Sequence, residues 1–105
     1  MSHMQSELAA QLAKLRLTPR LIDVVALLLQ GKSNKVIARD LSLSTETVKE
    51  HVASILHRLG VSSRAQVPMT VHPYFESLFA WDSARRQHTL PRSSATLSSA
   101  PYAQT

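Results

Sequence analysis

The amino-acid sequence predicts an all-α protein, a small bundle of short helices. Apolar residues in the middle of the chain recur at helical spacings of three and four. Serine or threonine precedes each apolar stretch, as a helix cap would. Both glycines of the chain stand where such a stretch ends, at the position where a left-handed residue costs least. Together these signals predict where the helices begin and where they end.

Length and charge indicate the class of partner. The chain of 105 residues has the size of one domain with a modest core, and 44% of its residues are apolar. Its formal net charge is +5, and most of the basic excess lies in the segment 14–64. Such a balance favours a polyanionic partner, most often nucleic acid, although a basic soluble domain without such a partner has the same charge.

The composition and the apolar pattern of the chain exclude several kinds of site and segment. The chain has no cysteine, which excludes disulfides and thiolate metal sites. No apolar stretch approaches the ~20 residues of a membrane span, and no secretory signal is recognisable, so we expect a cytoplasmic protein with no membrane partner.

Residues 1–16 are interpreted as a cloning scar followed by a linker or lead-in helix. If so, the chain is a domain of a longer protein.

Three helices are predicted in the middle of the chain, each with its own start signal. Thr18 is the N-cap of the first helix, Pro19 takes its first helical position, and Gly31 ends it. Ser33 caps the second helix, and a short turn then leads to the third, Thr45–Leu59. Two helices joined by such a turn form a helix-turn-helix, in which the second of them lies in the major groove of DNA.

The third helix is predicted to have an apolar face and a polar face. Four apolar residues form the face that packs on the core: Val48, Val52, Ile55 and Leu59. The opposite face carries Glu46, Lys49, Glu50, Ala53 and, near the far end, His57. Polar groups on the outward face of this helix are what contacts with base edges require, so DNA is the expected partner.

Beyond the third helix the signals change. Ser62 or Ser63 caps a short fourth helix, and we expect Pro68 to end it, because proline lacks the backbone donor and clashes with the preceding turn. Residues 68–88 are predicted to form a helical extension, whose helix begins near Pro73. The bundle therefore ends in an atypical C-terminal extension.

The extension holds four of the five aromatic residues of the chain. Two interpretations of the segment Tyr74–Trp81 are open. Its aromatic side chains complete the small core, or they form the partner surface of a protein-interaction module. The remaining residues, 89–105, are rich in Ser, Thr, Ala and Pro and are predicted to be disordered.

Five short motifs stand at fixed spacings within residues 17–67. In order they are LTPR at 17–20, QGKSNK at 30–35, IA at 37–38, TVKEHV at 47–52 and LGVSSR at 59–64. Together they closely resemble the LuxR/NarL/FixJ-type DNA-binding domain of bacterial transcription regulators. The resemblance implies a four-helix domain that binds double-stranded DNA, usually as a homodimer. It also implies an N-terminal receiver or sensor domain that is absent from this chain.

The resemblance also implies roles for single residues, carried over by position. Lys49, Glu50 and Ala53 match positions that face base edges. Seven others match positions at or near the phosphate backbone: Asn34, Lys35, Thr45, Thr47, His51, Arg58 and Arg64. Helix N-terminal amides, hydroxyl groups and cations all favour phosphate, which agrees with this assignment. Structural roles stay open beside these, such as a helix cap for Thr45 and packing for His51.

Three positions depart from the family pattern. Leu21 stands where the family usually has glutamate, which leaves Thr18 to cap its helix alone at a cost of about 0.5–1 kcal/mol. Glu50 places an acid on the DNA-facing side, where it either accepts a hydrogen bond from cytosine or repels phosphate and so sharpens specificity. Pro68 and the extension replace the regular fourth helix, the usual dimerisation surface of the family.

Two other functions compete with this one. Region 4 of a sigma factor shares the LTxR opening, but the segment His51–Arg64 favours the LuxR-type interpretation. An enzyme is not expected, because the histidines lack metal-ligand spacing and the chain has no glycine-rich phosphate loop, cysteine nucleophile or serine elbow. We therefore expect no catalytic residue, no metal site and no cofactor.

Overall fold

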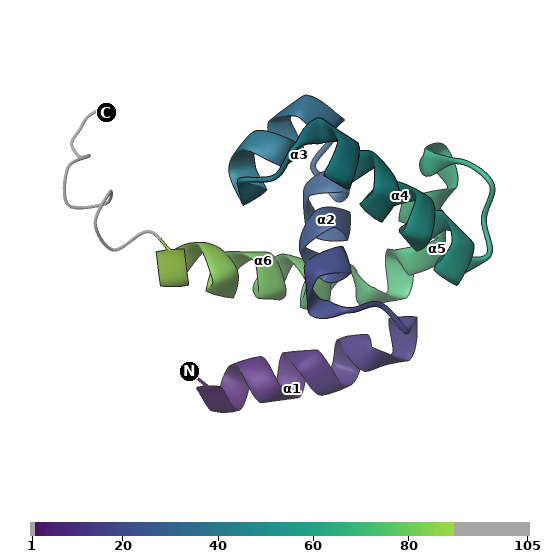
Figure 1. Ribbon diagram of the computed structural model, residues 1–105. Helices are drawn as coiled ribbons and strands as arrows, with labels where there is room; N and C mark the ends of the chain where they lie inside the picture. Colours follow the sequence, from purple (N-terminus) through teal and green to yellow (C-terminus); the bar gives the residue numbers. More distant parts are fainter. Residues whose placement is uncertain (1, 90–105) are drawn as a thin grey trace.

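The computed structural model describes residues 2–89, and every regular element in this range is helical (Figure 1). The α-helices are α1 (Ser2–Leu12), α2 (Pro19–Leu29), α3 (Asn34–Leu41), α4 (Thr45–Leu59), α5 (Val67–Val71) and α6 (Phe75–Thr89). Single 3-10 turns, η1 (Ala13–Leu15), η2 (Arg64–Gln66) and η3 (His72–Tyr74), join some of them. The predicted all-α bundle is confirmed. The predicted tail, 89–105, lies outside the described residues except for Thr89, the last residue of α6.

The predicted N-caps form the expected hydrogen bonds. The side-chain oxygens of Thr18, Ser33 and Ser44 accept from the backbone N–H three residues further on, at 3.2, 3.3 and 3.1 Å. Each bond satisfies one of the amides that a helix start leaves without a partner. Leu21, the residue that replaces the family's glutamate, is buried in the core, so its burial compensates for the missing half of the capping box.

Left-handed residues follow the ends of α2, α3 and α4. Gly31 and Gly60 have φ angles of 78° and 72°, as their positions in the sequence predicted. The turn between α3 and α4 uses Ser42 instead, with a φ of 58°. A serine in this conformation costs about 1–2 kcal/mol relative to glycine, and it carries no sequence signal that separates it from an ordinary turn residue.

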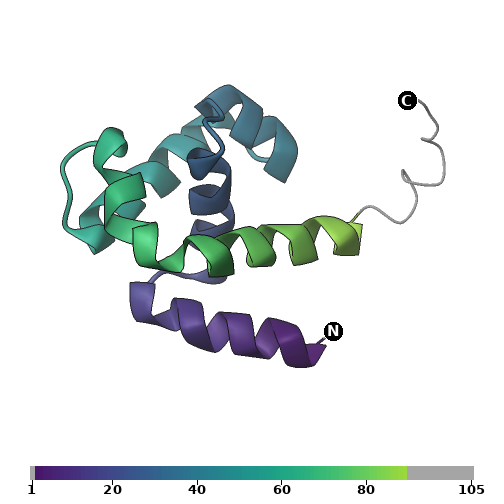
Figure 2. The same cartoon turned by 180° about the vertical axis from the view of Figure 1, so that it is seen from behind.

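Helix α2 lies in the middle of the molecule, between two pairs of helices (Figures 1 and 2). Helices α3 and α4 pack together on one side of it, and α1 and α6 run next to each other on the other side. All seven residues of α2 from Leu21 to Leu27 are buried, a pattern that a helix with one solvent-facing side cannot have.

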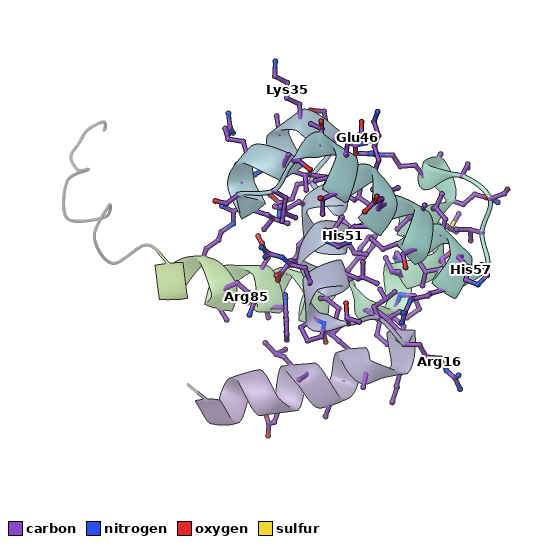
Figure 3. The ribbon with its side chains drawn as sticks, in the orientation of Figure 1. Arg16, Lys35, Glu46, His51, His57 and Arg85 are labelled. Atoms are coloured by element: carbon purple, nitrogen blue, oxygen red, sulfur yellow. The ribbon has the colours of Figure 1, made fainter. Side chains whose placement is uncertain are left out.

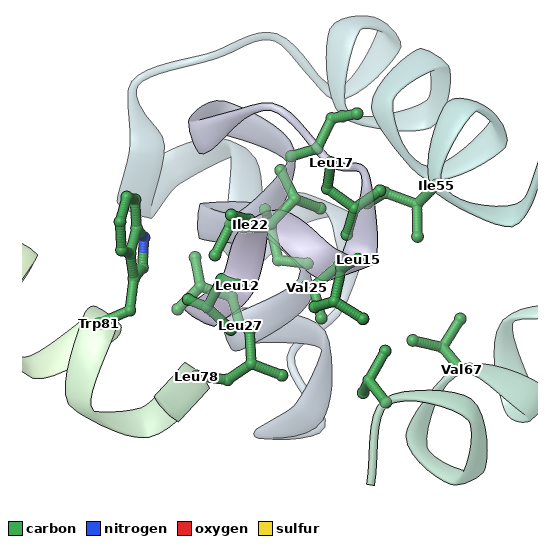
Figure 4. Close-up of a cluster of buried hydrophobic side chains, with 14 of the residues drawn as sticks. Leu12, Leu15, Leu17, Ile22, Val25, Leu27, Ile55, Val67, Leu78 and Trp81 are labelled. Atoms are coloured by element: carbon green, nitrogen blue, oxygen red, sulfur yellow. The ribbon is translucent and has the colours of Figure 1, made fainter. Parts of the chain in front are cut away.

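One continuous core joins all the α-helices (Figure 4). Its fully buried side chains come from every layer and include Leu12, Val24, Val25, Ile37, Val48, Ile55, Val67, Val71 and Leu78. The family-like part of the chain and the helices that flank it therefore fold as one unit.

Helix α5 corrects the expectation that Pro68 ends a helix. Pro68 stands in the first turn of α5, where the missing backbone N–H would have no intrahelical partner in any case. The helix therefore starts around the proline, and Val67 and Val71 on either side of it are buried. Helix α5 is nevertheless short, as expected, and η3 connects it to α6.

The helix predicted after Pro73 is confirmed as α6. It packs on α2 and on α1. Leu78 and Trp81 are buried, Tyr74 and Phe75 are half-buried, and Phe79 is 45% exposed. The aromatic segment therefore contributes mainly to the core of the monomer.

The pair Leu78 and Phe79 tests how strongly α6 contributes to stability. We expect Leu78→Ala to lower the free energy of unfolding by about 2–5 kcal/mol, because it leaves a cavity against α2 and α1. The control Phe79→Ala should change it by less than about 1 kcal/mol, because much of this ring is already in water. Urea unfolding followed by circular dichroism measures both values. Equal losses would show that α6 is not docked as described.

Candidate nucleic-acid interface

Helices α3 and α4 form a helix-turn-helix. The chain reverses at Ser42, and the N–H of Leu43 donates to the carbonyl of Ala38 at 2.8 Å. Leu43 itself packs against the core. Ser44 then caps α4. A turn closed in this way by backbone bonds and an apolar anchor fixes the direction in which α4 leaves α3.

The two predicted faces of α4 are confirmed. Val48 and Ile55 are fully buried, and Val52 and Leu59 are half-buried against the core. The residues predicted to lie on the opposite side are all exposed, namely Glu46, Lys49, Glu50, Ala53 and His57. One exposed side chain of this face, that of Lys49, makes a contact within the helix. Its Nζ donates to Oε2 of Glu46 at 3.4 Å, an exposed pair that contributes little and is easily exchanged for another anion.

An open notch lies where α3 begins. It is lined by Leu28, Gly31, Lys32, Ser33, Asn34, Lys35 and Arg64. Lys35 points away from the body of the protein at this end of α3 (Figure 3). The first amides of α3 and the nearby cations together make this end of the helix favourable for an anion.

Arg64 and Asn34, both predicted to lie near phosphate, contact each other. The guanidinium of Arg64 donates to Oδ1 of Asn34, and through Nη2 to the carbonyl of Lys32 at 2.6 Å. Arg64 is half-buried, and these bonds hold η2 against the turn between α2 and α3. Sequence reasoning did not find this role, because thirty residues separate the two side chains.

The other residues predicted near phosphate lie along α4. Thr45 and Thr47 belong to its first turn, and the Ser44 hydroxyl donates to Oγ1 of Thr47 at 3.0 Å. His51 is half-buried on the flank of the helix, as expected (Figure 3). Arg58 is exposed near the other end, and its Nη1 donates to the carbonyl of Arg16 at 3.2 Å. Most of the predicted set thus gathers around the starts of α3 and α4, and Arg58 stands apart from it.

One ion pair next to the notch was missed in the sequence. Nζ of Lys32 donates to Oδ2 of Asp40 at 2.9 Å and so ties the start of α3 to its last turn. Arg39 contacts the other oxygen of Asp40 at 3.3 Å. These cations, Lys32 above all, lower the pKa of the Asp40 carboxyl in spite of its partial burial. Lys32 precedes α3 and Asp40 lies within it, so no helical spacing indicated the pair.

Between residues 2 and 89, no group of three or more histidine, aspartate or glutamate side chains could hold a metal ion. None of the helices in the same range combines the length and apolar character that a membrane span needs.

The arrangement defines a helix-turn-helix domain, with a polar outer face on its second helix and cations at the start of its first. Residues 15–71 match the family described as bacterial regulatory proteins of the luxR family, and the chain belongs to this family. The predicted LuxR-type helix-turn-helix domain is confirmed, and with it DNA binding in transcription regulation as its class of function. The family is a class of regulators and not a class of enzymes.

Several curated bacterial proteins are similar over the same part of the chain. The transcriptional regulatory protein LiaR of Bacillus subtilis is 39% identical over 56 residues, which are 53% of this chain and 26% of LiaR. The nitrate/nitrite response regulators NarL and NarP of Escherichia coli are 42% and 50% identical over 57 and 48 residues. These matches cover 54% and 46% of this chain but only 26% and 22% of the two regulators. No solved structure shows a significant match to the chain.

The ion pair of Lys32 and Asp40 predicts a pH dependence of stability. Because the pKa of Asp40 is lower in the folded state, the stabilisation is complete above the ordinary carboxyl value of 3.8 and is lost as the pH falls through the folded-state pKa. Wild type should therefore exceed Asp40→Asn by up to about 1 kcal/mol at neutral pH, and the difference should vanish in acid. Urea unfolding at a series of pH values measures it. The control is Glu46→Gln in the exposed pair with Lys49, which should change the free energy of unfolding less at neutral pH. A loss of stability in Asp40→Asn that stays the same at every pH would contradict the assignment.

Proposed function

We propose that this domain binds double-stranded DNA by placing α4 in the major groove, with Lys49, Glu50 and Ala53 toward the base edges. The observation that carries the proposal is the division of α4 into two faces. Val48 and Ile55 anchor it in the core, and the three proposed contact residues are exposed on the other side. A rigidly held helix with an exposed polar face is what sequence recognition in the major groove requires.

The phosphate backbone is proposed to meet the starts of α3 and α4. Lys35 and the notch supply cations and helix amides, and Thr45, Thr47 and His51 add polar groups at the start and along the flank of α4. Arg64 and Asn34 are proposed to act as a pair, in which Arg64 holds the notch in shape. Arg58 is placed to reach phosphate only if DNA extends along the whole of α4. The net charge of +5 supports attraction to DNA over a longer range.

The setting of this activity is also proposed. The chain covers about a quarter of the length of LiaR and NarL. We infer that it works as the DNA-binding part of a longer regulator in the bacterial cytoplasm, joined to an N-terminal receiver or sensor domain, and that it acts on DNA as a homodimer. The names of the relatives, a transcriptional regulatory protein and two response regulators, support this setting.

A protein-interaction module that uses Tyr74–Trp81 finds less support. Trp81 is buried and Tyr74 is half-buried, so they face the protein's own core. Of the aromatic residues in this segment, only Phe79 is exposed, at 45%.

Two steps test the DNA-binding proposal. Selection of bound duplexes from a random pool with the purified domain identifies the preferred sequence. A salt titration with that duplex and with a scrambled one then separates specific from non-specific binding, since phosphate contacts make both steeply dependent on salt. A domain that enriches no sequence and shows no salt dependence would contradict the proposal.

Lys49 should contribute to specific binding. We expect Lys49→Ala to weaken binding to the selected duplex by about 1–3 kcal/mol, because a lysine at a base edge donates to acceptors that a wrong base lacks. Fluorescence anisotropy with a labelled duplex measures the loss. The control is Lys14→Ala, the same change in charge in η1, outside the helix-turn-helix. Similar losses for both variants would assign Lys49 to general attraction instead.

Lys35 should act on the phosphate backbone. Lys35→Ala is expected to weaken binding to the selected and the scrambled duplex alike, and to lower the slope of log K against log salt by about 0.9. The same titration gives both slopes. A loss confined to the selected duplex would place Lys35 at a base edge and not at phosphate.

A further inference from the structure

A buried carboxylate of α2 is held by two side chains of α6. Asp23 is 5% exposed. Its Oδ1 accepts from the indole Nε1 of Trp81 at 2.8 Å and from Nε of Arg85 at 2.9 Å, and its Oδ2 accepts from Nη2 of Arg85 at 2.7 Å. Arg85 thus binds the carboxylate in a bidentate manner, through Nε and Nη2. Its guanidinium also lies 5.3 Å from the centre of the Trp81 ring. Such geometry leaves the carboxylate little freedom to rotate.

The same carboxylate holds Arg20, which reaches the helix-turn-helix. Nη1 of Arg20 donates to Oδ2 of Asp23 at 3.1 Å, and Nη2 donates to the carbonyl of Leu41 at 3.1 Å. Leu41 is the last residue of α3, and the left-handed Ser42 follows it. The last carbonyls of a helix have no partner within the helix, so an arginine that binds one of them fixes where the turn begins.

A second contact joins α6 to the C-terminal end of α2, just before the turn into α3. Oδ2 of Asp82 accepts from Nε2 of Gln30 at 3.0 Å, and Gln30 is the C-cap of α2, just before the turn into α3. Asp82 also pairs with Arg86 at 2.9 Å. Helix α6 is therefore connected to the end of α3 through Asp23 and Arg20 and to the end of α2 through Asp82, although it lies on the opposite side of α2 from α3 (Figure 1).

We propose that α6 is a positioning element for DNA recognition. Trp81 and Arg85 hold Asp23, Asp23 aligns Arg20, and Arg20 fixes the end of α3, from which α4 departs toward DNA. Helix α6 lies outside residues 15–71, the part that matches the family, so this device belongs to the extension of this chain. The inference rests on the proposed DNA binding, because its effect is on the orientation of α4.

The bond between Arg20 and Leu41 is the weakest of these contacts, so a change at Arg85 is expected to alter the end of α3 measurably. Arg20 is 43% exposed, so its bond to the Leu41 carbonyl competes with water. Without Arg85, Arg20 becomes the main cation of a buried carboxylate, and its guanidinium is expected to turn away from Leu41 toward Asp23. The end of α3 then loses a fixed partner, while the exposed face of α4 keeps all its side chains.

The test compares Arg85→Met and Arg20→Met with Lys14→Met. All three remove one positive charge and keep an apolar chain, but Lys14 is exposed in η1, outside the contacts that connect α6 to α3. Affinity for the selected duplex is measured at a temperature at which circular dichroism shows every variant to be folded. We expect the first two to bind about three- to thirtyfold more weakly with an unchanged salt slope, and Lys14→Met to bind within about twofold of wild type. The double variant of Arg20 and Arg85 should lose no more than either single one.

Two further measurements keep a structural role apart from a positioning role. Hydrogen exchange of the Leu43 amide, which closes the turn, should speed up in Arg85→Met without DNA, while amides in the middle of α2 stay protected. Trp81→Phe, which removes only the indole donor and keeps an aromatic ring, should give a smaller change in the same direction.

Three outcomes would overturn the proposal. Unchanged affinity and unchanged exchange at Leu43 would limit α6 to general stability. A salt slope that falls with affinity would place Arg85 at phosphate. Additive losses in the double variant would separate Arg20 from Arg85. If wild type selects no duplex, the proposed function fails, whereas faster exchange at Leu43 in Arg85→Met would still show the link between α6 and the turn.

Discussion

The burial of α2 on all sides is the constraint on which the fold depends. A helix whose residues from Leu21 to Leu27 are all buried must be covered in every direction, and a pair of helices on one side cannot do this. Helices α3 and α4 cover one side, and α1 and α6 cover the other. The burial of Asp23 follows from the same constraint. Its charge is tolerated because Arg20, Arg85 and Trp81 satisfy it by hydrogen bonds.

This constraint also explains why the extension and the interface are connected. A polar group in a helix that is covered on both sides can exchange hydrogen bonds with both layers at once. Asp23 does so, because the Arg20 that it binds reaches α3 and the Arg85 that it binds comes from α6. Helix α6 lies outside the family match, which covers residues 15–71. It is thereby connected to the framework of the helix-turn-helix without approaching the face that is proposed to meet DNA.

Features with local causes were predictable from the sequence, and features with distant causes were not. The caps Thr18, Ser33 and Ser44 and the glycines at the helix ends act within one turn of their own position, so the limits of α2 and α4 followed from them. Pro68 was misinterpreted because the same lack of a donor that ends a helix also suits its first turn.

The candidate site shows the same division. The faces of α4 follow from helical periodicity, and the structure confirms them. The partners of Arg58 and Arg64, and the α6 partners of Asp23, lie 30 to 62 residues away in the sequence, where no spacing rule applies.

The single tryptophan of the chain gives the protein a built-in optical probe. Trp81 is buried against α2, donates to a carboxylate and has a guanidinium near its ring. Detachment of α6 would expose the indole to water and shift its emission to longer wavelength, while most of the helical circular dichroism would persist. Intrinsic fluorescence therefore distinguishes a local opening of this side of the molecule from unfolding of the whole domain, without any added label.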